Sequence, residues 1–267
     1  MTDAATYLAI AGFSDPGLKR DHNEDFIGFN QELGIAVLAD GMGGHQAGEI
    51  AAHMAVNSVL ENLQKFANSE KLVSITGSQL LKFVSSTISR SNKLIFQASE
   101  MQEAHRGMGT TLVTAMVKDS RVYAGHVGDS RLYLFREGNL TRITKDHSLV
   151  QELVDKGFYS EDEARTASVG HVVTRALGTR IDVEVDTVEC ELQENDILLL
   201  CSDGLSDMLS DELIMDSLRS RPTSLETTAK TLIKLANNQG GRDNISVILM
   251  ELKSRANTKN IDELGDA

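Results

Sequence analysis

The sequence predicts an α+β fold in which two consecutive helices separate groups of strands that pair in antiparallel fashion. Apolar residues recur at helical spacing over 47–63 and again over 78–103, and strand-like runs follow these helices instead of alternating with them. Farther along, Glu137-Gly138-Asn139 joins two short apolar runs as in a hairpin, and hairpins pair their strands in antiparallel fashion. These patterns indicate a layered fold rather than an alternating parallel one.

Short strands are predicted in the first part of the chain, at 7–13 and 26–40. The second apolar run ends abruptly at Asp40-Gly41, where a carboxylate leaves the end of a buried strand and the glycine lets the backbone turn. A similar apolar run ends late in the chain at Asp203-Gly204. We expect the fold to bring these two ends together around divalent metal ions.

The later part of the chain contains further strands, two further helices and one irregular segment. The strands are predicted at 110–117, 121–127, 132–135, 140–144, 182–192, 196–202 and 245–252, and the helices at 211–219 and 224–239. Residues 147–178 interrupt the strands with short helical stretches, one of them opened by a capping-box sequence at 160–163, and are predicted to form a flap over the site. No Pro-rich or Ser-rich linker is present, so we predict one domain over 1–253 and a polar tail over 254–267.

The composition excludes several classes of protein. The net charge is −13, which argues against a general nucleic-acid binder because phosphate backbones require clustered Lys and Arg. No apolar run approaches the roughly 20 residues that a membrane helix needs, and the first residues lack the basic start of a signal peptide. Two cysteines exclude a disulfide framework. We therefore expect a cytoplasmic protein without membrane contact, and we expect it to be a monomer.

Acidic residues cluster where the predicted strands end. The clusters are Asn23-Glu24-Asp25, Asp40-Gly41, Gly128-Asp129-Ser130-Arg131, Ser202-Asp203-Gly204 followed by Asp207, and Gly241-Arg242-Asp243-Asn244. One Asp-Gly pair alone most often marks a turn, but repeated clusters beside apolar runs are harder to explain as turns. Carboxylate and carbonyl oxygens suit hard cations such as Mg²⁺ or Mn²⁺, and the sequence offers no zinc-ligand spacing.

Motifs in a fixed order run along nearly the whole chain. They are Gly17-Leu18-Lys19-Arg20-Asp21-His22-Asn23-Glu24-Asp25, Ala39-Asp40-Gly41-Met42-Gly43-Gly44, Gly107-Met108-Gly109-Thr110-Thr111, Val127-Gly128-Asp129-Ser130-Arg131, Thr144-Lys145-Asp146-His147-Ser148, Thr174-Arg175-Ala176-Leu177-Gly178, Cys201-Ser202-Asp203-Gly204-Leu205 and Arg242-Asp243-Asn244-Ile245-Ser246. In this series the sequence resembles the metal-dependent Ser/Thr protein phosphatases of the type-2C (PPM) family, in their compact bacterial form. The resemblance implies a four-layer α-β-β-α sandwich, with two antiparallel sheets flanked by helices, and hydrolysis of phosphoserine and phosphothreonine.

The resemblance also implies two Mn²⁺ or Mg²⁺ ions at one end of the sandwich. In the family pattern Asp40 bridges the two ions, and Asp203 and Asp243 complete one of them. The Gly41 carbonyl ligates the other ion, and Glu24 holds a metal-bound water. Two cations lower the pKa of such a water, so that hydroxide is available near neutral pH for attack on phosphorus.

A third, weaker cation site is implied at Asp129, together with Asp203 and Asp207. Arg20 is implied to bind the substrate phosphate, which suits a planar and permanently charged guanidinium. The substrates would be phosphorylated proteins, as produced by a Ser/Thr kinase.

Several other side chains near these motifs have expected roles. His147 and Arg175 belong to the flap segment and are candidates for substrate contacts, since loops carry specificity, while a turn role for His147 stays open. Arg131 is expected to pair with a neighbouring carboxylate. Cys201 is expected to be a buried strand residue rather than a catalytic thiol. Met42 occupies the position at which eukaryotic relatives carry a histidine proposed as the acid, so no acid is assigned.

Two alternative functions stay open on the sequence alone. A catalytically inactive phosphoprotein-binding regulatory module of the same fold would be favoured by a missing metal ligand, but Asp40, Asp203 and Asp243 are all present. A phosphatase for a partner-switching regulator or a small phosphate ester would keep the same chemistry with another substrate. The leading hypothesis is an active phosphoprotein phosphatase.

Overall fold

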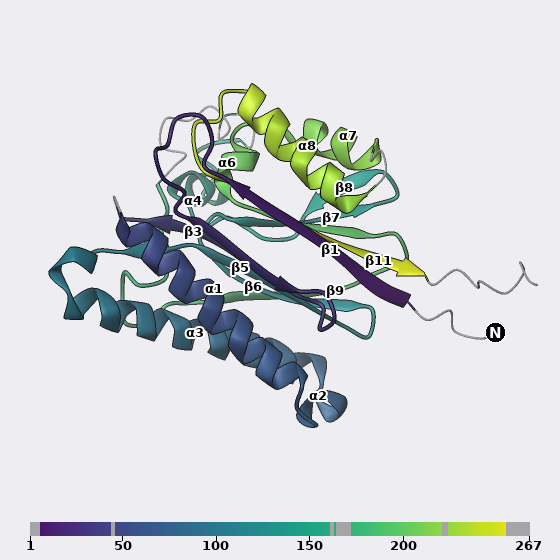
Figure 1. Cartoon of the computed structure of the whole chain (residues 1–267), viewed down its shortest axis with the longest axis horizontal. Coiled ribbons are helices and arrows are strands. Elements are labelled where there is room, and N and C mark those ends of the chain that lie inside the picture. The colour runs from purple at the N-terminus through teal and green to yellow at the C-terminus, as the bar shows by residue number, and fades with distance from the viewer. Residues whose placement is uncertain (1–5, 44–45, 161–162, 164–171, 221–223, 255–267) are drawn as a thin grey trace, which may run out of the picture.

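Two antiparallel β-sheets lie face to face, with helices on the outer side of each sheet (Figure 1). The computed structural model describes residues 6–43, 46–160, 163, 172–220 and 224–254. The arrangement confirms the predicted four-layer α-β-β-α sandwich. Among the helices of the described residues, none has the length and apolar character needed to cross a membrane.

The first sheet has five strands in the order β1-β11-β10-β7-β8. Their bounds are Thr6–Asp15 (β1), Ile245–Ser254 (β11), Ile197–Cys201 (β10), Arg131–Arg136 (β7) and Asn139–Arg142 (β8). The first and last strands of the described chain pair over their whole length, from Thr6 opposite Ser254 to Asp15 opposite Ile245. The antiparallel β7–β8 pair confirms the predicted hairpin.

The second sheet follows the order β2-β3-β5-β6-β9, and the short strand β4 pairs with the end of β3. Their bounds are Asp25–Asn30 (β2), Ile35–Met42 (β3), Gly109–Thr110 (β4), Leu112–Lys118 (β5), Arg121–Val127 (β6) and Asp186–Glu191 (β9). Strand β9 is shorter than the predicted strand over 182–192, because pairing with β6 starts only at Asp186 opposite His126.

Helices cover the outer faces of both sheets (Figure 1). Their bounds are Gln46–Ala67 (α1), Lys71–Ser74 (α2), Gly77–Met101 (α3), Glu103–His105 (η1), Leu149–Asp155 (α4), Asp203–Ser206 (α6), Asp211–Arg219 (α7) and Leu225–Asn238 (α8). Helices α1 and α3 pack on the second sheet, and α7 and α8 pack on the first. The predicted N-cap of α8 is confirmed, because the Ser224 side chain accepts a hydrogen bond from the Thr227 N–H.

Three hydrophobic layers hold the sandwich together. Along β3, Ile35, Val37 and Ala39 pack against the α1 and α3 side, whereas Ala36 and Leu38 face the other sheet. Strand β11 alternates in the same way between the middle layer and the α8 side. This alternation follows from the two-residue period of a strand and requires both faces of each strand to be apolar.

The elements that carry the predicted site residues meet at one end of the sandwich. The end of β3, the start of α1 and helices α4 and α6 lie there in Figure 1, away from the N-terminus. Part of the flap is described, including α4 and the predicted capping box, in which Ser160 Oγ accepts from the Glu163 N–H and Glu163 Oε2 accepts from the Ser160 N–H. Residues 44–45, the remaining flap residues 161–162 and 164–171, and the predicted tail beyond Ser254 fall outside the described residues.

Candidate metal centre

Two of the predicted acidic clusters face each other across β2 and β3. Asp25 opens β2, and it is the direct register partner of Asp40 near the end of β3. Burial raises the pKa of Asp25, which is 5% exposed, to about 7. The pKa of Asp40 is raised well above its ordinary value by burial and by the charges of Asp25, Asp203 and Asp129.

Asp203 and Asp129 approach the same place from other parts of the fold. Asp203 begins α6 directly after β10, and Asp129 lies in the turn between β6 and β7. Burial raises the pKa of Asp129 to about 7, and the charge of Asp203 contributes to the shift. The four carboxylates of Asp25, Asp40, Asp129 and Asp203, here called the acidic cluster, therefore act on one another electrostatically.

The backbone around Asp40 is fixed by two neighbouring threonines. The Thr111 N–H and the Thr110 hydroxyl both donate to the Asp40 carbonyl, each over 2.8 Å. In return the Asp40 N–H donates to Thr111 Oγ1 over 3.1 Å. Thr111 Oγ1 also lies 2.7 Å from Ser130 Oγ, which links this end of β3 to the residue after Asp129.

Arg20 lies directly against one of the predicted metal ligands. Its Nη2 donates to Asp243 Oδ2 over 2.6 Å, with the two side chains 55% and 37% exposed. The hydrogen bond and the charge of Asp243 raise the pKa of Arg20, so the guanidinium keeps its charge. The predicted phosphate-binding side chain thus stands at the solvent side of the predicted metal site.

Asn244 connects the Arg20 loop to the segment just before β11 that contains Asp243. Its Nδ2 donates to the carbonyls of Pro16 and His22, over 3.0 and 2.9 Å. Its Oδ1 accepts from the Glu24 N–H over 2.8 Å. These three bonds set the position of the loop that contains both Arg20 and Glu24.

Two glycines allow the start of α1 to pack directly on the end of β3. A Cβ added to Gly41 would overlap the carbonyl oxygens of Gly48 and Glu24, and a Cβ added to Gly48 would overlap the Glu24 carboxylate. Glu24 therefore lies between the end of β3 and the first turn of α1. Burial raises the pKa of Glu24, although the charge of Arg20 opposes the shift.

The donor set of this centre fits hard divalent cations. Carboxylate oxygens and a backbone carbonyl are the ligands that Mg²⁺ and Mn²⁺ prefer. Cations bound there would relieve the burial and mutual repulsion that raise the carboxylate pKa values of the acidic cluster. In addition, Asp25 Oδ1 is buried and has no hydrogen-bond partner within the described residues.

The predicted third site is brought together only in part. The charge of Asp203 raises the pKa of Asp129, so these two carboxylates are close enough to interact, as a shared cation site requires. Asp207 instead is exposed just beyond α6, where its N–H donates to the Asp203 carbonyl over 2.8 Å. A metal role for Asp207 stays a prediction.

The two flap residues singled out in the sequence lie against the body of the protein. His147 is 7% exposed, and burial lowers the pKa of its ring. Arg175 forms ion pairs with Asp186 over 3.0 Å and with Glu184 over 3.1 Å. A direct substrate contact for either residue stays a prediction.

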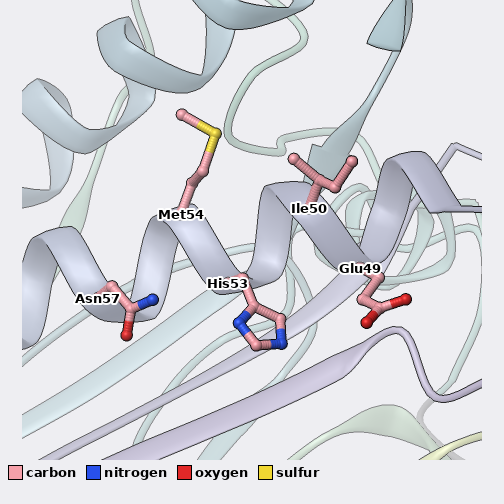
Figure 2. Close-up of a pocket in the computed structure, with 5 residues that line it drawn as sticks. All are labelled: Glu49, Ile50, His53, Met54 and Asn57. Atoms are coloured by element: carbon pink, nitrogen blue, oxygen red, sulfur yellow. The ribbon is translucent and has the colours of Figure 1, made fainter. Parts of the chain in front are cut away.

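A surface hollow of about 550 Å³ lies over α1, lined by Glu49, Ile50, His53, Met54 and Asn57. Figure 2 shows that these side chains diverge: Ile50 and Met54 point to one side of the helix, and Glu49 and His53 to the other. The His53 ring is already stacked on Phe26, with centroids 3.6 Å apart. Because its lining groups do not converge, this hollow is a weaker candidate site than the acidic cluster.

Cys201 and Arg131 have the surroundings that the sequence predicts. Cys201 is buried in β10, and burial raises its thiol pKa to about 12, which confirms a structural residue. Arg131 pairs with Asp146 through Nε and Nη2, the latter over 2.7 Å, as expected of a neighbouring carboxylate. The support that Asn244 gives to the site was not predicted; its place directly after Asp243 was the signal that the sequence offered.

Comparison with known proteins agrees with this geometry. The family model described as "Protein phosphatase 2C" matches residues 19–249. The "Serine/threonine phosphatase stp" of Listeria monocytogenes serotype 4b is 40% identical over 241 residues, which cover 89% of this chain and 93% of the relative.

Two solved structures are similar over nearly the whole chain. The Mycobacterium tuberculosis serine/threonine phosphatase PstP/Ppp has a TM-score of 0.83 and 38% identity, covering 92% of this chain and 99% of that one. A catalytic domain of PstP in complex with two manganese ions has a TM-score of 0.81 and 36% identity, covering 94% and 100%. With its acidic cluster at the strand ends, its two facing sheets and a family match over most of its length, the chain belongs to the protein phosphatase 2C family.

Proposed function

We propose that the protein is a metal-dependent phosphoprotein phosphatase that hydrolyses phosphoserine and phosphothreonine. The observation that carries this proposal is the contact between Arg20 and Asp243 beside the acidic cluster. A permanent positive charge for phosphate oxygens thereby adjoins a group of carboxylates suited to divalent cations. An inactive phosphoprotein-binding module would need Arg20 for the phosphate but not the carboxylates suited to divalent cations.

Two Mn²⁺ or Mg²⁺ ions would be held by Asp40, Asp203, Asp243 and the Gly41 carbonyl, and a third by Asp129. When bound, such ions supply Lewis acidity for the phosphoryl group and acidify water. The manganese-bound PstP domain, at 36% identity, supports this choice of metal.

The protein's own groups position the phosphate and hold the ligands in place. Arg20 binds phosphate oxygens through guanidinium donors, and its charge balances that of the phosphoryl group. Glu24 lies beside Arg20, and burial raises the pKa of its carboxyl group; its oxygens are placed to accept hydrogen bonds from a water and orient it. Thr110 and Thr111 keep the Asp40 backbone rigid, which limits reorganisation when the substrate binds.

Phosphorylated proteins are the proposed substrates, and a Ser/Thr kinase is the proposed source of their phosphate. The Listeria relative, named as a serine/threonine phosphatase, supports the first part. We further propose a monomer of the cytoplasm that binds neither nucleic acid nor membranes. The free thiols of Cys190 and Cys201 support a reducing compartment.

The test is hydrolysis of an aryl phosphate and of a phosphothreonine peptide with Mn²⁺ or Mg²⁺. We expect turnover that EDTA abolishes and that Asp40→Ala lowers by at least about 100-fold, since the metal centre would lose one of its ligands. Asp216→Asn is the matched control, because Asp216 pairs only with Arg219 at the surface among the contacts described. Metal-independent turnover, or full activity of Asp40→Ala, would refute the proposal.

A further inference from the structure

A second group of polar side chains lies beside the acidic cluster and is not used by the chemistry above. It consists of His126 at the end of β6, Asp186 at the start of β9, His147 and Arg175. The two imidazole rings are stacked, with centroids 4.7 Å apart and planes 17° from parallel. One ligand atom each from His126, His147 and Asp186 lies within 4.8 Å of the others, which is the composition of a transition-metal site.

The hydrogen bonds of His147 argue against a metal in that place. The Gly128 N–H donates to His147 Nδ1 over 3.1 Å, so Nδ1 carries no proton. The proton of a neutral ring is then on Nε2, which lies 3.4 Å from both Asp186 Oδ2 and Arg175 Nη1. Because a guanidinium only donates, the Nε2 proton is directed to Asp186, and a protonated nitrogen cannot ligate a metal. The other oxygen of Asp186 already accepts from Arg175 over 3.0 Å.

His147 instead joins two segments that approach the metal centre. Its N–H donates to the Gly128 carbonyl over 3.0 Å, so that Gly128, which precedes Asp129, is bonded to His147 through both of its backbone groups. Its carbonyl accepts from the Thr174 N–H over 2.8 Å, in the part of the chain that returns from the flap. One residue thus connects the Asp129 turn with the flap's returning end.

The flap's returning end is also attached next to Asp40. Leu177 exchanges two backbone hydrogen bonds with Thr110, of 2.8 and 3.1 Å. Thr110 in turn donates its hydroxyl to the Asp40 carbonyl over 2.8 Å. Both attachments of the returning end therefore lead, through one intermediate residue, to the neighbourhood of a carboxylate in the acidic cluster.

We propose that His147 is a positioning residue that fixes the Gly128–Asp129 turn to the returning end of the flap, residues 172–177, and so sets the position of Asp129 for a cation. The coupling to cations rests on the proposed function, whereas the fixing of the turn does not. The ring acts through its two nitrogens, each on a different partner, and that division makes the proposal testable.

Two substitutions separate these nitrogens. In His147→Asn the amide oxygen can take the place of Nδ1 and accept from Gly128, while the contact with Asp186 is lost. In His147→Gln the longer side chain can reach Asp186, while the acceptor for Gly128 is lost. His105→Asn, at a histidine in η1 far along the chain from both partners, is the control.

The first readout is hydrogen exchange of the Gly128 amide in metal-free protein, which requires no catalysis. We expect exchange about tenfold faster in His147→Gln, because the free energy of one hydrogen bond corresponds to about that factor. In His147→Asn and in the control the exchange rate should stay near that of the wild type. Equal exchange rates in the Asn and Gln variants would overturn the proposal, because the ring would then only fill space.

The second readout is the Mn²⁺ concentration that gives half-maximal hydrolysis of an aryl phosphate. We expect about a tenfold increase in His147→Gln and little change in His147→Asn, as for loss of a group that orients a ligand. An unchanged Mn²⁺ dependence in both variants would overturn the coupling, even where the exchange result holds.

Absence of turnover in the wild-type protein would refute the proposed function but leave the exchange test valid. Zn²⁺ binding that requires both His126 and His147 would overturn the proposal in favour of a metal site.

Discussion

Asp25 and Asp40 stand directly opposite each other at the end of the β2–β3 pair, so two carboxylates share one edge of the second sheet. Asp25 is buried and accepts a hydrogen bond of 2.8 Å from Ser202 Oγ, across the sandwich. Such a pair is costly without a cation, because each charge is removed from water and repelled by the other. The metal-free protein should therefore show that cost as a pH dependence of its stability.

The first prediction concerns Asp25→Asn without metal. Burial raises the pKa of Asp25 from 3.8 to about 7, so the folded state binds a proton more tightly than the unfolded state. The contribution of Asp25 to the free energy of unfolding of the wild type is complete below about pH 4, and it is lost as the pH rises to about 7. The free energy of unfolding of Asp25→Asn, minus that of wild type, should rise across this window and level off above it. Urea unfolding at several pH values with EDTA measures the difference; a flat difference would contradict it.

The second prediction concerns the effect of metal on thermal stability. Cations that bind only the folded state at about 100 times their dissociation constant add about 2.7 kcal/mol to the free energy of unfolding. For a chain of this size the melting temperature should rise by about 5–10 °C with Mn²⁺, and EDTA should reverse the rise. Asp203→Asn should lose most of the shift. An equal shift in Asp203→Asn would mean that the stabilising ion binds elsewhere.

The third prediction concerns two glycines with positive φ. Gly128 has φ +104°, and an added Cβ would lie 2.6 Å from Thr111, whereas Gly157 has φ +74° and nothing within 4 Å. Gly157→Ala should cost about 1 kcal/mol of stability from backbone conformation alone. Gly128→Ala should cost about 3 kcal/mol or more, since backbone strain and overpacking combine. Chemical unfolding of both variants measures the difference. Similar losses of stability would show that the turn at Gly128 can change its conformation to fit the added methyl group.

The fourth prediction concerns the shape of the Arg20 side chain. Arg20→Lys keeps the charge but loses the fork that can bind phosphate through two donors. Its kcat/KM for an aryl phosphate should fall by about 10- to 100-fold, as for loss of a charged hydrogen bond. Arg219→Lys, an exposed residue of α7 paired with Asp216, should stay near wild type. If Arg20→Lys retained full kcat/KM, Arg20 would have no role in binding phosphate beyond its charge.

Local pattern accounts for the parts of the fold that the sequence predicted well. Helix α7 coincides with the predicted 211–219, because its apolar period and its Ser210 cap are both encoded nearby. The start of β9 was not predicted, since the residues before Asp186 are apolar enough for a strand but have no partner in β6. Pairing partners are a property of the whole fold, and local sequence does not contain them.

In the candidate site, too, local sequence predicted some features and long-range contacts determine the others. Strand ends followed by Asp-Gly located Asp40 and Asp203, because an apolar run and a carboxylate are adjacent in sequence. The contact between Arg20 and Asp243 spans 223 positions, and the three bonds of Asn244 reach more than 200 positions back. Such contacts depend on the register of β1 against β11 and could not be predicted from spacing.

The pairing of β1 with β11 has a consequence for synthesis of the protein. The first strand of the described chain remains without its neighbour until the last strand, which follows Asp243, has left the ribosome. Because Asp243 and Asn244 also arrive at that moment, a nascent chain has neither its complete first sheet nor its complete metal centre until β11 has emerged. Chains that terminate before Asp243 therefore lack part of the metal centre, and they also lack the strand that joins β1 to the rest of the first sheet.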